Sequence, residues 1–170
     1  MRSIIVTALL ALIVTARLSA QDAAELDRRN GFKTIVLATT IDSVKGAVFK
    51  KDFKEKEIFE AKLYETRHPD YMSIGEVKVR QVELKTYKNL VYRIIVITDK
   101  DPRIMQSLSK SYGKATYDMG TGRYTWAGTS VSLSVLSSKK TYTLTYSSYP
   151  IYKMMNDDKG KKVDVMAEDF

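Results

Sequence analysis

The sequence predicts an α+β protein with an antiparallel sheet of about seven strands. Two helix-plus-three-strand units are expected to form it, with the helices packed on one face of the sheet. Apolar and hydroxyl residues alternate over the segments 130–136 and 141–147, as in strands with one buried face. A helix is expected over 102–112, because Asp101-Pro102 is a typical helix start and Gly113 a typical helix end.

The chain has 170 residues, of which 44% are apolar and 28% are charged. This balance is typical of a globular protein, and the length suits one domain with its own core. We expect three parts: a signal peptide over residues 1–20, a single α+β domain over 21–152, and a C-terminal segment over 153–170. The last segment is charged, and the sequence leaves open whether it is a short docked helix or a frayed tail.

The first twenty residues have the pattern of a secretory signal peptide. Arg2 precedes an uncharged run over 4–14, and Leu18-Ser19-Ala20 ends in a small residue suited to cleavage after Ala20. A membrane anchor is the rival interpretation, but spanning needs about 20 apolar residues, and Arg17 interrupts the run. We therefore expect an exported protein, periplasmic or extracellular.

The first half of the domain is expected to begin with a strand over 32–37. Thr39 or Thr40 is expected to cap a helix that ends near Val48, because Val44, Ala47 and Val48 form an apolar stripe. The segment 50–57 alternates positive and negative charges, which is typical of a solvated turn or loop. A strand over 58–65 should follow.

A long hairpin is expected next, with strands over 76–86 and 90–98. Two apolar pairs in the first strand are out of phase, which predicts a β-bulge near Arg80-Gln81. The run Ile94-Ile95-Val96-Ile97 is apolar on both faces and predicts a central strand.

Three strands should follow the helix, over 123–127, 130–136 and 141–147. Their water-facing side chains would form an open row of hydroxyl groups, which we take as the candidate binding face. The residues of this hydroxyl face are Ser130, Ser132, Ser134, Thr141, Thr143 and Thr145.

Several short motifs give the chain a family resemblance. They are Asn30-Gly31-Phe32-Lys33, Thr40-Ile41-Asp42-Ser43-Val44, Tyr112-Gly113-Lys114, Tyr124-Thr125-Trp126-Ala127-Gly128 and the ending Ala167-Glu168-Asp169-Phe170. Together they resemble uncharacterised exported proteins of Gram-negative bacteria. The repeated helix-plus-three-strand order is similar to the β-lactamase-inhibitor-protein-like architecture. Some proteins of that architecture bind other envelope or secreted proteins, and a shared fold does not fix function.

The sequence gives little support for metal binding, phosphate binding or catalysis. The chain has no cysteine and one histidine, His68, expected in a surface loop, so we expect no metal site and no cofactor. No serine lies in a Gly-x-Ser-x-Gly motif, and the Gly120-Thr121-Gly122 segment lacks the pattern of a phosphate loop. Acid pairs are harder to exclude. The strand-borne candidates for such a pair are Glu60, Glu65, Glu76 and Glu83.

These observations favour a non-enzymatic exported protein that binds another envelope or secreted protein, or an envelope component. The alternative is a small-ligand or lipid carrier, which would require an apolar cavity beneath Ile104 and Leu108. A third hypothesis is a hydrolase with two converging carboxylates, one with a raised pKa. The net charge of +8 is consistent with solubility or with anionic partners; specific nucleic-acid binding is not expected.

Overall fold

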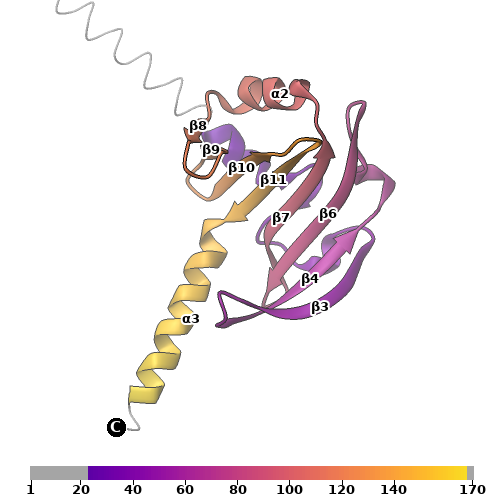
Figure 1. Cartoon of the computed structure of the whole chain (residues 1–170). Coiled ribbons are helices and arrows are strands. Elements are labelled where there is room, and N and C mark those ends of the chain that lie inside the picture. The colour runs from indigo at the N-terminus through magenta and orange to yellow at the C-terminus, as the bar shows by residue number, and fades with distance from the viewer. Residues whose placement is uncertain (1–22, 168–170) are drawn as a thin grey trace, which may run out of the picture.

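The computed structural model describes residues 23–167 and confirms the α+β class with an antiparallel sheet (Figure 1). The sheet has nine strands, eight of them in the spatial order β3-β4-β6-β7-β11-β10-β9-β8, while β5 pairs with β6. The main strands are β3 (Ala47–Glu55), β4 (Phe59–Thr66), β6 (Val77–Tyr87), β7 (Leu90–Asp99), β9 (Arg123–Ala127), β10 (Val131–Ser137) and β11 (Thr141–Ser148). The short ones are β5 (Ser73–Ile74) and β8 (Thr116–Asp118).

The expectation of about seven strands is therefore wrong. The predicted strand over 32–37 lies outside this sheet as a two-strand hairpin of β1 (Gly31–Phe32) and β2 (Ile35–Val36), because the chain turns at Lys33, whose φ is +53°. Strands β3, β5 and β8 were not expected. Residues of β8 are all exposed and those of β5 half-buried, so neither short strand has the alternation that identifies a strand in a sequence.

The helix expected from Thr39 or Thr40 to Val48 is also wrong. Only a three-residue 3-10 turn, Ile41–Ser43, forms there, and β3 begins at Ala47. The charged segment 50–57, expected as a loop, mostly continues β3, whose pairing with β4 satisfies its backbone groups along one side. Because β3 is an edge strand whose side chains are mostly exposed, lysines and acids are favourable there. They give the segment the composition of a loop, and for that reason the sequence pattern did not identify the strand.

The hairpin of β6 and β7 agrees with the sequence prediction. The register of the two strands shifts between Val79 and Gln81, so the β-bulge near Arg80-Gln81 is confirmed. A second shift lies between Lys85 and Thr86. Strand β7 pairs with β6 on one side and β11 on the other, which confirms the central position that its apolar run indicates.

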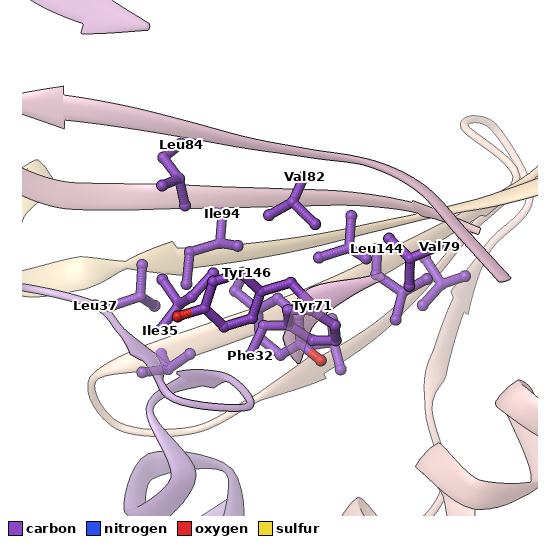
Figure 2. Close-up of a cluster of buried hydrophobic side chains, with 14 of the residues drawn as sticks. Phe32, Ile35, Leu37, Tyr71, Val79, Val82, Leu84, Ile94, Leu144 and Tyr146 are labelled. Atoms are coloured by element: carbon purple, nitrogen blue, oxygen red, sulfur yellow. The ribbon is translucent and has the colours of Figure 1, made fainter. Parts of the chain in front are cut away.

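The main core lies on one face of the sheet, which we call the inner face. In one row across it, Leu84, Ile94 and Tyr146 are neighbours on β6, β7 and β11, and each is almost fully buried. Figure 2 shows these strand residues pointing towards Phe32, Ile35, Leu37 and Tyr71 from the first half of the chain. This part of the inner core is thus covered by the β1–β2 hairpin and adjoining loops, which the sequence did not identify as a cover.

The helix α2 (Pro102–Tyr112) lies on the same inner face and has the predicted ends. The Asp101 side chain accepts a hydrogen bond from the Arg103 backbone N–H, Pro102 is the first helical residue, and Gly113 follows with φ +73°. Its buried residues, Ile104 and Tyr112, belong to the main core.

The helix α3 (Tyr149–Ala167) packs against a second cluster of buried residues. Ile151 and Met155 pack against Phe59, Ala61 and other residues of this cluster. Along β4, the side chains of Phe59 and Ala61 point to the opposite face of the sheet from that of Tyr64, which contacts the main core. The second cluster therefore lies on the face opposite the inner one, which we call the outer face.

The remainder of α3 extends past the β3–β4 hairpin (Figure 1). Its first two turns pack against the outer cluster, whereas the later residues whose burial is described are mostly exposed. The predicted signal peptide, residues 1–20, lies outside the described residues. Within 23–167, no helix has the length and apolar character needed to cross a membrane.

Candidate ligand-binding sites

The hydroxyl face predicted from the sequence lies on β10 and β11. Ser134 is paired with Thr145, and Thr143 with Leu136, in the antiparallel register of these strands. Ser132, Ser134, Thr143 and Thr145 are half-buried, and they alternate with fully covered neighbours of the inner core. These four hydroxyls therefore form a continuous polar strip on the outer face.

The other two predicted residues have local structural roles. Ser130 donates its hydroxyl to Asp27 Oδ1 at 2.8 Å, and Thr141 Oγ1 lies 2.7 Å from Ser138 Oγ in the β10–β11 turn. Both hydroxyls are occupied by the fold itself. The strip available to a partner thus consists of Ser132, Ser134, Thr143 and Thr145.

Asp27 connects the N-terminal helical segment, residues 23–29, to the start of β10. Its carboxylate accepts hydrogen bonds from the backbone N–H groups of Thr129, Ser130 and Val131. Burial acts to raise the pKa of Asp27, but these hydrogen bonds outweigh it, and the net pKa lies below its usual value. A Cβ at Gly128 would lie 2.4 Å from Asp27 Oδ1, so this contact requires glycine.

A cavity of about 580 Å³ lies between α2, the N-terminal segment and the sheet. We call it the α2 cavity. Ile104 and Leu108 line it from α2, as the carrier hypothesis requires, and Leu144 and Tyr146 line it from β11. Its other residues are Arg28, Arg29, Gly31, Phe32, Lys33, Ile74, Ser107, Ser111 and Tyr112.

Cationic side chains surround this apolar interior. The side chains of Arg28 and Arg29 are 70% and 49% exposed, and both bind the carboxylate of Glu25, at 2.7 and 2.6 Å. Their hydrogen bonds lower the pKa of Glu25 to about 2. Lys33 donates to the backbone carbonyl of Asp70 at 2.6 Å. Three cations thus lie at the cavity with a single carboxylate between two of them, which leaves a local excess of positive charge.

Tyrosines give the cavity an aromatic wall. Burial raises the pKa of Tyr112, and the guanidinium of Arg29, 5.6 Å from the centre of its ring, only partly opposes this effect. Burial also raises the pKa of Tyr146, so both phenols stay neutral at physiological pH. The wall therefore offers apolar ring surface and neutral hydroxyls rather than negative charge.

Two of the glutamates considered for an acid pair, Glu65 and Glu83, are direct neighbours on β4 and β6. Hydrogen bonds from Arg67 and Lys50 lower the pKa of Glu65, whereas a general acid needs a raised one. Glu76 binds Arg103 at 3.0 Å, and Glu60 is exposed.

His68 caps the short 3-10 turn η2 (Pro69–Tyr71), where its Nδ1 accepts a hydrogen bond from the Asp70 backbone N–H at 3.3 Å. Its ring packs against Tyr71. No group of three potential metal ligands occurs among the described residues.

Sequence reasoning placed Ile104 and Leu108 over a possible cavity, but it missed the cationic residues Arg28, Arg29 and Lys33. The consecutive pair Arg28-Arg29 is visible in the sequence. Its position beside α2 depends on contacts between segments about 80 residues apart, which a pattern read along the chain does not contain.

Comparison with known proteins identifies no relative: no family model, no curated protein sequence and no solved structure matches the chain.

Proposed function

We propose that this protein is an exported, non-enzymatic binding protein that holds a small anionic ligand with an apolar body in the α2 cavity. The observation that carries this proposal is a cavity of about 580 Å³ with an apolar interior and a cationic surround. Its size is within the range of small-molecule sites, about 300–1,000 Å³, and such sites combine apolar walls with a few placed polar groups.

The chemistry of the lining narrows the ligand class. Phe32, Tyr112 and Tyr146 provide ring faces that favour an aromatic or cyclic body. The guanidinium groups of Arg28 and Arg29 retain N–H donors beyond those used by Glu25, and such donors bind carboxylate or sulfonate oxygens. We infer that the anionic substituent lies at the arginines and the rings lie beneath α2.

Export is part of the proposal and is supported by the sequence pattern of residues 1–20. The resemblance to exported proteins of Gram-negative bacteria supports it too.

The test is a titration of the protein with 8-anilinonaphthalene-1-sulfonate, a dye that joins aromatic rings to an anionic group. Binding is measured by the fluorescence of the dye. Ser107 is exposed and lines the cavity, whereas Ser109 is exposed on α2 and does not line it. We expect Ser107→Phe to weaken binding by about tenfold, as expected for a blocked pocket, and Ser109→Phe to leave it unchanged. Equal affinities of the two variants would contradict the proposal.

A second candidate function, protein binding through the hydroxyl strip, is favoured by a different observation. Ser132, Ser134, Thr143 and Thr145 are half-buried on the outer face, with the exposed Leu136 beside Thr143. A crosslinking pull-down with the wild type and a Ser134→Lys/Thr145→Lys variant tests it. Capture of the same single protein by both would exclude this surface as its interface.

A further inference from the structure

A second concave site lies on the other side of the molecule, between α3 and the β3–β4 hairpin. Its volume is about 900 Å³, and we call it the α3 groove. Figure 1 shows α3 running past this hairpin. The lining residues come from the hairpin, the β6–β7 turn and α3.

The floor of the groove is apolar. Phe59, Ala61 and Tyr87 are each less than 9% exposed and belong to the outer cluster, and the rings of Phe59 and Tyr87 meet edge to face. Ile58, at the tip of the hairpin, is 43% exposed. An extended hydrocarbon chain lying from Ile58 to Tyr87 would cover apolar surface that water now contacts, which is favourable.

The rim of the groove is basic. Asp158 is already bound by Lys88 Nζ at 2.6 Å and by the Tyr87 hydroxyl at 2.9 Å. The remaining charged residues are four lysines and two acids: Lys54, Lys62, Lys159, Lys161, Asp52 and Glu60. Their excess of positive charge favours an anionic group at the rim.

We propose that the α3 groove binds a single-chain anionic amphiphile, with its hydrocarbon chain on the floor and its head group among the rim lysines. This goes beyond the proposed function, because the α2 cavity lies on the inner face of the sheet and shares no lining residue with the groove. The two sites also differ in their charged groups: Arg28 and Arg29 line the α2 cavity, whereas lysines line the α3 groove.

The test compares dodecyl amphiphiles that share a chain and differ in head group, each below its micelle concentration. The protein is titrated calorimetrically with dodecanoate, dodecyl maltoside and dodecyltrimethylammonium. We expect the affinity to be highest for the anionic head group, lower for the neutral one and lowest for the cationic one. We expect dodecanoate to bind about tenfold more tightly than dodecyl maltoside, which is the size of a favourable charge contribution in a partly exposed site. Equal affinity for all three, or no binding of dodecanoate, would overturn the proposal.

Location is tested by methyl NMR. Dodecanoate is expected to shift the methyl signals of Ile58, Ala61 and Met155, and to leave those of Ile104 and Leu108 in place. Shifts confined to Ile104 and Leu108 would overturn the groove as the site while supporting the α2 cavity, so the two proposals fail separately.

Two matched charge reversals test the role of the rim. Lys159→Glu/Lys161→Glu changes the groove, and Lys139→Glu/Lys140→Glu makes the same change in net charge at the exposed β10–β11 turn. We expect the first to weaken dodecanoate binding about tenfold with little effect on dodecyl maltoside, and the second to change neither. An equal effect of both pairs would contradict a head-group site at the rim.

Discussion

The two faces of the sheet are stabilised in different ways. The inner face carries the main core, in which Val82, Ile94 and Leu133 have no measurable exposure. The β1–β2 hairpin, adjoining loops and α2 cover it. The outer face carries a smaller aromatic cluster under the first turns of α3. Beside that cluster lies a polar network.

The centre of this network is the carboxylate of Glu55. It accepts hydrogen bonds from the Tyr92 hydroxyl at 2.8 Å and Lys85 Nζ at 3.1 Å, and Arg93 lies within ion-pair distance. Arg93 in turn donates to the Tyr152 hydroxyl of α3. Apolar burial therefore supplies most of the stability of the domain, whereas α3 is positioned by a few aromatic contacts and by directional polar ones.

The largest expected effect is in the inner core. Ile94→Ala should lower the free energy of unfolding by about 4 kcal/mol, because it leaves a cavity in a fully buried central strand. Ile95→Ala is the matched control: its side chain is half-buried on the outer face, so about 1 kcal/mol is expected. Urea denaturation of both variants measures the difference. An equal loss of unfolding free energy in the two variants would contradict the conclusion that the inner face contributes more to stability than the outer face.

Met155→Ala should have the next largest effect, about 2 kcal/mol, the lower end for a buried methionine. Because α3 docks by its first two turns, we expect the loss to appear mainly as local opening of the helix. Hydrogen exchange of the α3 amides should accelerate while that of β7 stays slow. Asn156→Ala, at an exposed position, is the control. Equal acceleration in β7 would mean that α3 and the sheet unfold together.

Glu55→Gln should lower the free energy of unfolding by about 1 kcal/mol at pH 7, because Lys85 and Arg93 lose a partly buried charged partner. Burial acts to raise the pKa of Glu55, but Tyr92, Lys85 and Arg93 together lower it below its usual value.

The direction of the pH dependence follows from that lowered pKa. The ionised carboxylate stabilises the folded state above the unfolded pKa, and this contribution is lost as the pH falls through the lower, folded pKa. The wild type should therefore lose its advantage over Glu55→Gln as the pH falls from about 5 through the lowered pKa of the folded state. Parallel stability curves for the two proteins over this range would contradict a stabilising role of the charge.

The smallest effect concerns the edge of the outer cluster. Burial and the hydrogen bond to Asp158 raise the pKa of Tyr87 to about 12. Asp158→Asn should lower this pKa part of the way towards its ordinary value, because the charge is removed while the burial remains. NMR titration of the tyrosine ring carbons measures it, with Asp157→Asn as the control. An unchanged pKa would show that α3 does not hold Asp158 against Tyr87.

Sequence patterns predicted the strands and the helix whose side chains alternate between core and water. The helix α2 was recognisable from Asp101, Pro102 and Gly113, and the bulge near Arg80-Gln81 from two apolar pairs out of phase. The edge strand β3 was missed because its burial follows no period, so its lysines are equally compatible with a loop.

The candidate sites divide in the same way. The hydroxyl strip and the residues Ile104 and Leu108 follow from local periodicity. The basic surround of the α2 cavity and the α3 groove do not, because each brings together residues from segments far apart in the chain.

The sequence by itself determined the class of fold and the central strands, since alternation over 131–136 and 141–146 leaves one face that must be buried. Only the tertiary structure decided which segments cover each face. Irregular segments and α3 contribute few apolar side chains apiece, so their positions depend on the complementary surface of a sheet that is already formed. The partners of Asp27 and Glu55 were also decided by the tertiary structure. Their hydrogen bonds join residues 30 to 104 positions apart, and only the folded chain brings these residues together.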